Sequence, residues 1–164
     1  MAPDLFVRRA HLRDASAIAR LNNSFADSGQ MLRRTPEMIT SAIHDYVVVQ
    51  DASGSLLACG ALKEYSPSVA EIAAIAVAPE AHGRGLGRAV VRAVEGLARI
   101  RGIHDVFALT LQPDFFSAIG YQRVDRARYP EKIRRDCLGC ARRFACNERC
   151  FARNLIADGL QRAA

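Results

Sequence analysis

The feature that most constrains the fold of this chain is a glycine-rich segment at residues 82–87, with the sequence His-Gly-Arg-Gly-Leu-Gly. The preceding residues 71–78 are mostly apolar and end at Pro79, which is typical of a buried strand that stops at a turn. Apolar side chains then recur at helical spacing, at Leu86, Val90, Val94 and Leu97. The segment therefore predicts a strand, a glycine turn and an amphipathic helix, in that order.

The glycine turn is expected to bind an anion. Glycines at alternate positions let the backbone adopt positive φ and approach a ligand closely. Free N–H groups and the helix dipole favour a negative group at the start of the helix, where Arg84 and Arg88 add positive charge. A dinucleotide-binding turn needs a third glycine where this chain has Arg88, and a P-loop needs Gly-Lys-Ser/Thr. Neither motif is present, which leaves a phosphate site of another kind or a tight turn without a ligand.

The rest of the sequence predicts a single α/β domain that covers residues 1–164. Asp14 suits the N-cap of a helix that runs to Phe25, and Pro36 suits the first turn of a second helix. Gly102 suits the C-terminal cap of the helix that follows the glycine turn. Further strands are expected at residues 5–9, 46–50, 56–65, 106–109, 121–124 and 151–157, and a further helix at 113–119. A turn at residues 51–55 makes the strands at 46–50 and 56–65 a predicted hairpin. This order predicts a mixed, mostly antiparallel sheet that is flanked by helices.

Charge and hydropathy limit the partners. Residues 121–153 contain ten Lys/Arg and four Asp/Glu, which accounts for the whole formal net charge of +6. Such a patch can mark a nucleic-acid interface, but a solvated face or a basic wall around a small anionic substrate is preferred, so nucleic acid is not expected. No apolar run approaches the roughly 18 residues of a membrane span, and the N-terminus has no secretory signal. A cytoplasmic protein without a membrane partner is therefore expected.

The glycine segment resembles the signature of the GNAT family of N-acetyltransferases, and the similarity covers residues 5–125. That signature is Arg/Gln-x-x-Gly-x-Gly/Ala after an apolar strand, so His82 departs from the usual first residue. The resemblance implies acetyl-CoA as the co-substrate. It implies that the main chain of Ile75, Ala76 and Val77 binds the pantetheine arm. The pyrophosphate would be bound by the loop residues, which are His82, Gly83, Arg84, Gly85, Leu86, Gly87 and Arg88.

A narrower resemblance is to the acetyltransferase domain of N-acetylglutamate synthases, above all the short stand-alone bacterial type. It is carried by five segments, at residues 31–37, 70–77, 107–110, 115–121 and 129–140. It implies that the acceptor is the α-amine of L-glutamate, in the opening step of arginine biosynthesis. It also implies that Arg33 or Arg34 pairs with a substrate carboxylate, beneath a lid formed by the first two helices. An exposed helix entry is the alternative interpretation of the two arginines.

The mechanism needs a base, because acetyl transfer requires a neutral amine and α-amines are largely protonated near neutral pH. Glu71 matches the position of the usual base of the family, and a surface or ion-paired strand glutamate is the alternative. A main-chain N–H within residues 75–77 would stabilise the oxyanion. Phe116 stands where many members of the family carry the tyrosine that protonates the thiolate, so the general acid is left open.

The C-terminal segment, residues 129–164, is rich in cysteine and arginine and is assigned to the same domain. Four of the five cysteines lie in it, at Cys137, Cys140, Cys146 and Cys150. Four thiols suit a closed zinc site, and an iron–sulfur cluster is the other metal centre considered. Reduced structural thiols are the alternative. Cys59, alone in a strand, is expected in the core.

Two other functions stay open beside glutamate acetylation. The first is acetylation of another amino acid, a polyamine or a protein N-terminus. The second is a metal- or nucleic-acid-binding regulator in which the glycine turn only senses acyl-CoA. A homodimer is left open. The sequence has no amino-acid-kinase domain like that of the long synthases, so arginine feedback through such a domain is not expected.

Overall fold

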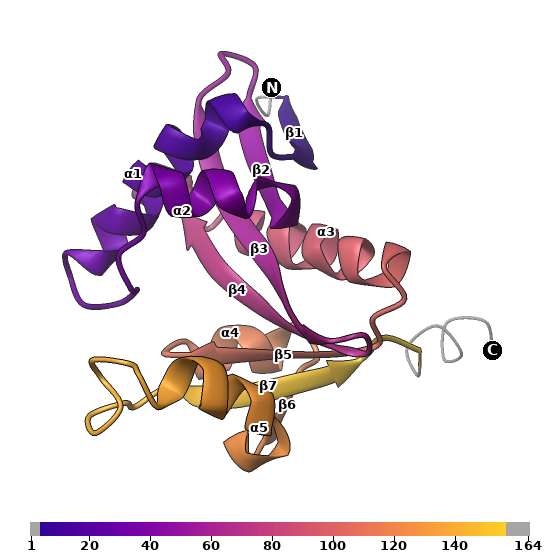
Figure 1. Cartoon of the computed structure of the whole chain (residues 1–164). Helices are drawn as coiled ribbons and strands as arrows, with labels where there is room; N and C mark the ends of the chain where they lie inside the picture. Colours follow the sequence, from indigo (N-terminus) through magenta and orange to yellow (C-terminus); the bar gives the residue numbers. More distant parts are fainter. Residues whose placement is uncertain (1–3, 157–164) are drawn as a thin grey trace. The chain divides into compact units, whose positions relative to one another are not determined.

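The computed structural model describes residues 4–156 of the chain (Figure 1). Its seven strands follow the hydrogen-bonded order β1-β2-β3-β4-β5-β7-β6. The chain divides into two compact units, one of residues 4–63 and 72–97 and the other of residues 64–71 and 98–156. Within the described residues, no helix is long and apolar enough to cross a membrane.

The first unit contains β1 (Leu5–Arg9), β2 (Tyr46–Asp51), and most of β3 (Leu56–Ser66) and β4 (Val69–Val77). β1 pairs with β2, and β2 with β3, both in antiparallel fashion, as the hairpin prediction requires. The hairpin turn is fixed by Asp51, whose Oδ1 accepts hydrogen bonds from the N–H groups of Ser53 at 2.9 Å and Ser55 at 3.0 Å. This Asx-type turn is a local reason for the chain reversal predicted at residues 51–55.

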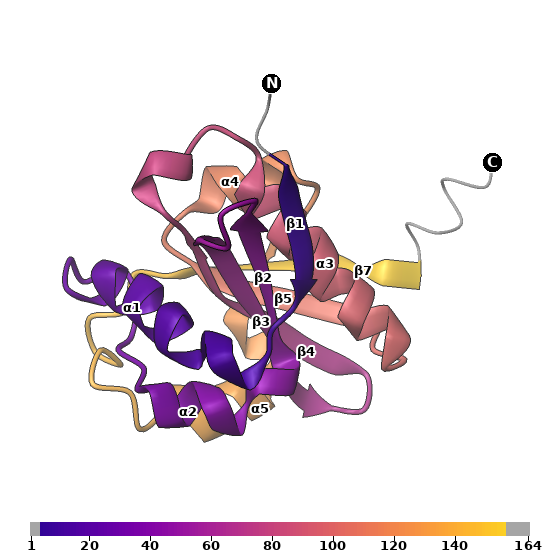
Figure 2. The ribbon, with the colours of Figure 1, turned by 90° about the horizontal axis from the view of Figure 1, so that it is seen from above.

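Helices cover both faces of the strands of the first unit. They are α1 (Ala15–Ala26), α2 (Pro36–Ser41) and most of α3 (Leu86–Ile100). α1 and α2 lie side by side and bury Ile18 and Ile39 against a face that includes Tyr46 and Cys59 (Figure 2). α3 lies on the opposite face, where a Cβ on Gly60 would come within 2.4 Å of a Val90 methyl. A glycine is therefore needed for the close approach of α3 to β3.

The N-cap prediction at Asp14 is correct in position and wrong in its contact. α1 begins after Asp14, but the carboxylate does not accept from the helix N–H groups. It binds the main-chain N–H of His11 at 2.7 Å and both Nη atoms of Arg8, at 2.7 and 3.0 Å. A short 3₁₀ turn, Leu12–Asp14, precedes the helix and turns the side chain back toward β1. The bidentate ion pair with Arg8 lowers the pKa of Asp14 below its usual value.

The second unit pairs the first residues of β4 with β5 (Asp105–Thr110) in parallel, and β5 and β6 (Gln122–Val124) with β7 (Arg149–Asn154) in antiparallel fashion. α4 (Pro113–Ala118) confirms the predicted short helix, and Gly102 has the positive φ, 73°, of a helix C-cap. β7 begins two residues before the predicted strand and ends at Asn154. Residues 155–156 are helical, so the prediction is wrong there, and residue 157 lies outside the described part of the chain. The sheet is mixed and mostly antiparallel, as predicted.

One helical segment of the second unit was not predicted. A single turn of α-helix, α5 (Pro130–Lys132), runs directly into a π-helical turn at Ile133–Cys137. The sequence there is dominated by charged residues and has no apolar period that indicates a helix. π-turns are rare and frequently occur at functional sites.

Candidate active site

The glycine loop has the backbone geometry that the sequence predicts. β4 ends at Val77, a 3₁₀ turn covers Pro79–Ala81, and α3 begins at Leu86. Gly83 and Gly85 have φ values of 76° and 75°, and no atom lies within 4 Å of a Cβ built on either. Glycine is thus required there by the backbone conformation, while the space around the loop is open for a ligand.

His82 has a structural function that explains its departure from the family signature. Its ring Nε2–H donates a hydrogen bond of 2.8 Å to the carbonyl oxygen of Val77, the last residue of β4. The contact links the start of the loop to the end of the strand. The ring nitrogen therefore holds the turn in place, although Val77 is one of the residues predicted to face the pantetheine arm.

The charges of the loop fit a pyrophosphate. The side chains of Arg84 and Arg88 are exposed, and neither pairs with a carboxylate among residues 4–156. Two unpaired guanidinium groups beside open glycine backbone at a helix start form a suitable site for a multivalent anion. The residues predicted for acetyl-CoA therefore fit the phosphate part of that co-substrate.

β4 changes conformation just before the residues predicted to bind the pantetheine arm. Ala74 has φ of 53°, in the left-handed region that non-glycine residues rarely adopt. Its carbonyl oxygen lies 3.7 Å from the thiol of Cys59. Ile75 and Val77 are half-buried and Ala76 is buried. The interruption redirects the main chain between Glu71 and Ile75, and residues held in this conformation often mark functional sites.

Glu71 is buried in a network of polar side chains within the second unit. Its Oε2 accepts hydrogen bonds from Lys132 Nζ at 2.8 Å and from Tyr65 Oη at 3.0 Å. Lys132 Nζ also lies 3.1 Å from Asp136 Oδ2, to which Tyr65 donates as well. Glu71 is 6% exposed, so it is not a surface residue. Glu71 is therefore an ion-paired strand glutamate, and its predicted function as a base depends on its contacts with Lys132 and Tyr65.

The protonation states of this network follow from burial and charge. Burial, together with the negative charges of Glu71 and Asp136, raises the pKa of Tyr65 far above its usual value, so its hydroxyl stays protonated. Burial alone would lower the pKa of Lys132, but the charge of Glu71 and its hydrogen bond outweigh it and raise the pKa. Lys132 therefore supplies a positive charge to both carboxylates, Glu71 and Asp136.

Arg33 and Arg34, both in the first unit, lie in different surroundings. The Arg33 guanidinium pairs with Asp27, and both side chains are more than 60% exposed. Arg34 is half-buried, and its charge acts on the hydroxyl of Tyr46, where it partly offsets the rise in pKa that burial causes. No carboxylate within the described part of the chain pairs with Arg34. Of the two arginines left open by the sequence, Arg34 has the charge available for a substrate carboxylate.

Asn23 holds the main chain of Arg34 and was not predicted. Its Nδ2 donates to the Arg34 carbonyl at 2.8 Å, and its Oδ1 accepts from the Arg34 N–H at 2.9 Å. The preceding Asn22 donates to the carbonyl of Leu32 at 2.9 Å. An Asn-Asn pair inside a predicted amphipathic helix is the signal that could have indicated these contacts, since asparagine is a poor helix former.

Phe116 is buried, at 4% exposure, in an aromatic cluster of the second unit. It makes edge contacts with Phe115, with ring centroids 5.1 Å apart, and with Tyr121, at 5.2 Å. The side chain is therefore a core residue in this chain.

The four C-terminal cysteines do not gather into one ligand set. Among residues 4–156, no group of three or more His, Cys, Asp or Glu side chains is arranged to hold a metal ion. Cys150 is buried in β7, between Leu109 and Val124 of the neighbouring strands, and burial raises its thiol pKa to about 11. All four are free thiols, and the metal prediction has no support from the structure. Cys59 is fully buried, as expected.

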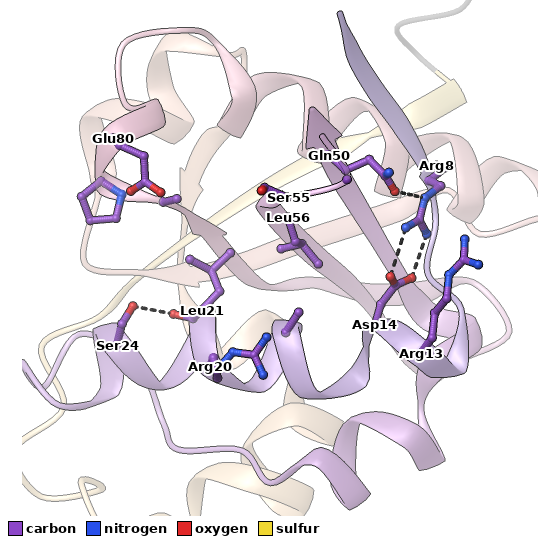
Figure 3. A pocket seen from close by; sticks show the side chains of 14 residues that line it. Arg8, Arg13, Asp14, Arg20, Leu21, Ser24, Gln50, Ser55, Leu56 and Glu80 are labelled. Carbon is purple, nitrogen blue, oxygen red and sulfur yellow. Dashed lines mark hydrogen bonds and ion pairs between the residues drawn. The ribbon is translucent and has the colours of Figure 1, made fainter. Parts of the chain in front are cut away.

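A cavity of about 780 Å3 lies on the first unit, between α1 and the tip of the β2–β3 hairpin (Figure 3). Arg8, held by Asp14 and Gln50, forms one end of it, and Glu80 lies at the other. Its lining includes none of the predicted site residues. The cavity is also lined by Ala78, Pro79 and Glu80, which lie just before the glycine loop.

Comparison with protein families agrees with this description. The model of the Acetyltransferase (GNAT) family matches residues 15–123, which include the glycine loop, Glu71 and Arg34. The chain belongs to the GNAT family and is an acetyl-CoA-dependent N-acetyltransferase.

The curated relatives include an uncharacterised N-acetyltransferase and several amino-acid acetyltransferases. An uncharacterised N-acetyltransferase of Chlorobaculum tepidum is 39% identical over 94% of this chain and 99% of its own length. The amino-acid acetyltransferase of Mycobacterium tuberculosis is 31% identical over 73% of this chain and 69% of its own. That of Neisseria meningitidis is 31% identical over 79% of this chain, which spans only 30% of its length.

Solved structures of an N-acetylglutamate synthase and of a mycobacterial protein are similar to this chain. N-acetylglutamate synthase of Neisseria gonorrhoeae, in complex with coenzyme A and N-acetyl-glutamate, has a TM-score of 0.83 and 28% identity. The match covers 94% of this chain and 36% of the synthase. A Mycobacterium tuberculosis protein in complex with coenzyme A has a TM-score of 0.79 and 25% identity, and the match covers 92% of this chain and 99% of that one.

Proposed function

We propose that this N-acetyltransferase acetylates the α-amine of L-glutamate, as a cytoplasmic enzyme of arginine biosynthesis. The observation that carries the proposal is that Arg34 has no carboxylate partner within residues 4–156. Its main chain is held by two hydrogen bonds with the Asn23 side chain. A guanidinium that extends from a backbone held in this way is suited to bind a substrate carboxylate. A carboxylate-bearing acceptor fits this feature better than a polyamine does.

The named relatives support the same acceptor. Two curated relatives are called amino-acid acetyltransferase, and one similar structure contains coenzyme A and N-acetyl-glutamate. Because this chain spans about a third of the Neisseria proteins, their activity is carried to it only as part of the proposal.

Acetyl-CoA supplies the activated acetyl group. In the proposed reaction, residues 82–88 bind its pyrophosphate through the open glycine backbone and the Arg84 and Arg88 side chains. The main chain of residues 75–77, directly after the conformational break at Ala74, binds the pantetheine arm and donates an N–H to the oxyanion.

Glu71 is the proposed base. Its carboxylate is buried and paired with Lys132, and in the proposed reaction it accepts the proton of the α-ammonium group. The amine so freed attacks the thioester carbonyl, and coenzyme A leaves as its thiol or thiolate. Phe116 has no proton to give, so the proposal assigns no general acid.

A panel of acceptors tests the proposal. Coenzyme A release is measured with L-glutamate, L-glutamine, L-aspartate, spermidine and a short peptide, each against acetyl-CoA alone. We expect the highest kcat/KM for L-glutamate. Preference for spermidine or for the peptide N-terminus would replace glutamate as the acceptor, and preference for L-glutamine would reassign Arg34 to the α-carboxylate.

A further inference from the structure

The buried cation beside Glu71 is unusual for this chain. Of the 23 Lys/Arg residues only Lys63 and Lys132 are lysines, and Lys132 is the one in the Glu71 network. Its side chain is 13% exposed, whereas those of Arg33, Arg128 and Arg134, which also pair with carboxylates, are each more than half exposed.

The geometry of the network requires a compact cation. One nitrogen, Lys132 Nζ, donates to Glu71 Oε2 at 2.8 Å and to Asp136 Oδ2 at 3.1 Å. An ammonium group can direct its three N–H bonds to separate acceptors from a single point, whereas a guanidinium presents a wide planar fork. Lys132 and Asp136 are four residues apart on the turn formed by α5 and the π-helix, so the backbone fixes their contact.

The ammonium of Lys132 is an opposite charge in contact with Glu71, which favours the ionised form of a carboxylate. Tyr65 has a single hydroxyl proton, while the carboxylates of Glu71 and Asp136 both lie within its reach. Two nearby carboxylates in a buried site repel each other, and burial adds a further penalty on their charge. Loss of the ammonium would therefore favour the protonated form of Glu71, which cannot take a proton from an amine.

Among residues 4–156, no other cationic side chain contacts Glu71. Arg135 lies over the ring of Tyr65, 4.9 Å from its centroid, and donates to the Glu64 carbonyl. The thiols of Cys137 and Cys150 face the charge of Glu71, and burial raises the pKa of both, so they stay neutral. Arg126 is directed to Cys146 and to the carbonyl of Glu148. Within residues 4–156, Lys132 is the cation that contacts Glu71.

We propose that Lys132 is a positioning residue for acetyl transfer, which keeps Glu71 ionised and directs its carboxylate for proton uptake. The proposal rests on the proposed function, in which Glu71 is the base. It gives the Cys/Arg-rich C-terminal segment a function that does not depend on its cysteines.

The pH profile of kcat/KM tests this function with the best acceptor of the panel. Lys132→Met removes the charge at nearly constant length. We expect the acid limb of its profile to move up by about one pH unit or more, as the loss of an adjacent opposite charge requires. Turnover should fall about tenfold or more near pH 7 and recover toward the wild-type value at high pH. The KM for acetyl-CoA should not change.

A double-mutant cycle shows whether Lys132 acts through Glu71. If it does, Glu71→Gln with Lys132→Met should be no slower than Glu71→Gln alone. Additive losses, or a loss in Lys132→Met that is the same at all pH values, would overturn the proposal. Arg128→Met is the matched control, because Arg128 pairs with Asp105 in the same unit but is half-exposed. Its profile should match that of the wild type.

Two further results separate the possible failures. If Glu71→Gln is as active as the wild type across pH, the base assignment of the proposed function is wrong, and the function of Lys132 falls with it. If Glu71→Gln is slow but Lys132→Met is normal, only the function of Lys132 is wrong. Should Lys132→Met fail to fold, Lys132→Gln keeps two N–H donors without the charge, and the same shift of the acid limb is expected.

Discussion

The side chain of Asn23 binds both polar main-chain groups of Arg34, with Nδ2 donating to the carbonyl oxygen at 2.8 Å and Oδ1 accepting from the N–H at 2.9 Å. The contact joins α1 to the segment that precedes α2. It fixes the backbone from which the Arg34 guanidinium extends toward Tyr46.

Loss of the contact between Asn23 and the Arg34 main chain should weaken substrate binding more than it lowers the stability of the fold. Asn23→Ala loses two hydrogen bonds of about 0.5–1.5 kcal/mol each, so the KM for L-glutamate should rise about tenfold. The KM for acetyl-CoA should stay within about twofold, because the glycine loop is untouched. Ser24→Ala is the control, since the Ser24 hydroxyl binds the Leu21 carbonyl of its own helix. Equal effects of the two substitutions would contradict the function assigned to Asn23.

The two neighbouring arginines should differ sharply. Arg34→Met should raise the KM for L-glutamate by about 30-fold or more, because a charge-assisted hydrogen bond contributes roughly 1.5–3 kcal/mol. Arg33→Met should have a small effect, since an exposed ion pair such as that with Asp27 contributes little. Steady-state kinetics with glutamate as the varied substrate make the comparison. A larger effect at Arg33 would show that the wrong arginine has been chosen.

The base assignment predicts a pH-dependent defect. Glu71→Gln should lower turnover most at neutral and low pH, where the amine is protonated, and the deficit should shrink as the pH approaches the amine pKa of about 8 or above. Acetyl-CoA affinity, measured by titration calorimetry, should be unchanged. Wild-type turnover of this variant at every pH would remove Glu71 from the mechanism.

The loop glycines allow a matched test of the co-substrate site. Gly85 and Gly29 have φ values of 75° and 76°, and a Cβ on either would meet no atom within 4 Å. Alanine at each position should therefore cost about the same stability, roughly 1–2 kcal/mol for a left-handed non-glycine residue. Only Gly85→Ala should also weaken acetyl-CoA binding. Equal acetyl-CoA affinities of the two variants would argue against the loop as the pyrophosphate site.

Metal analysis of the purified protein tests the cysteine segment. We expect less than about a tenth of an equivalent of zinc or iron, because a bound metal needs several deprotonated ligands in one place. Cys150 is buried in β7 with its thiol pKa raised to about 11 by that burial. A stoichiometric metal, lost together with the folded state on chelation, would restore the metal hypothesis.

The sequence was sufficient for those features that depend on local pattern. Apolar periodicity and turn residues indicated β1, the β2–β3 hairpin, α3 and α4 close to their observed bounds. The glycine positions indicated the open turn at Gly83 and Gly85, because left-handed backbone is a local requirement.

Contacts between distant segments could not be read in the same way. Glu71 and Lys132 are 61 residues apart, and they meet because α5 and the π-turn return to β3 and β4. The segment around Lys132 lacks the apolar period that would have indicated a helix. Likewise, four cysteines within residues 137–150 suggested a metal site, but the alternation of β7 places Cys150 in the core, away from a shared centre.

Identification of the product tests the central claim most directly. The protein is incubated with acetyl-CoA and L-glutamate, and the products are quantified by mass spectrometry and NMR. We predict equimolar coenzyme A and N-acetylglutamate acetylated at the α-amine, and much less of it from Arg34→Met under the same conditions. Coenzyme A release without N-acetylglutamate, or faster acetylation of spermidine than of glutamate, would contradict the proposed function.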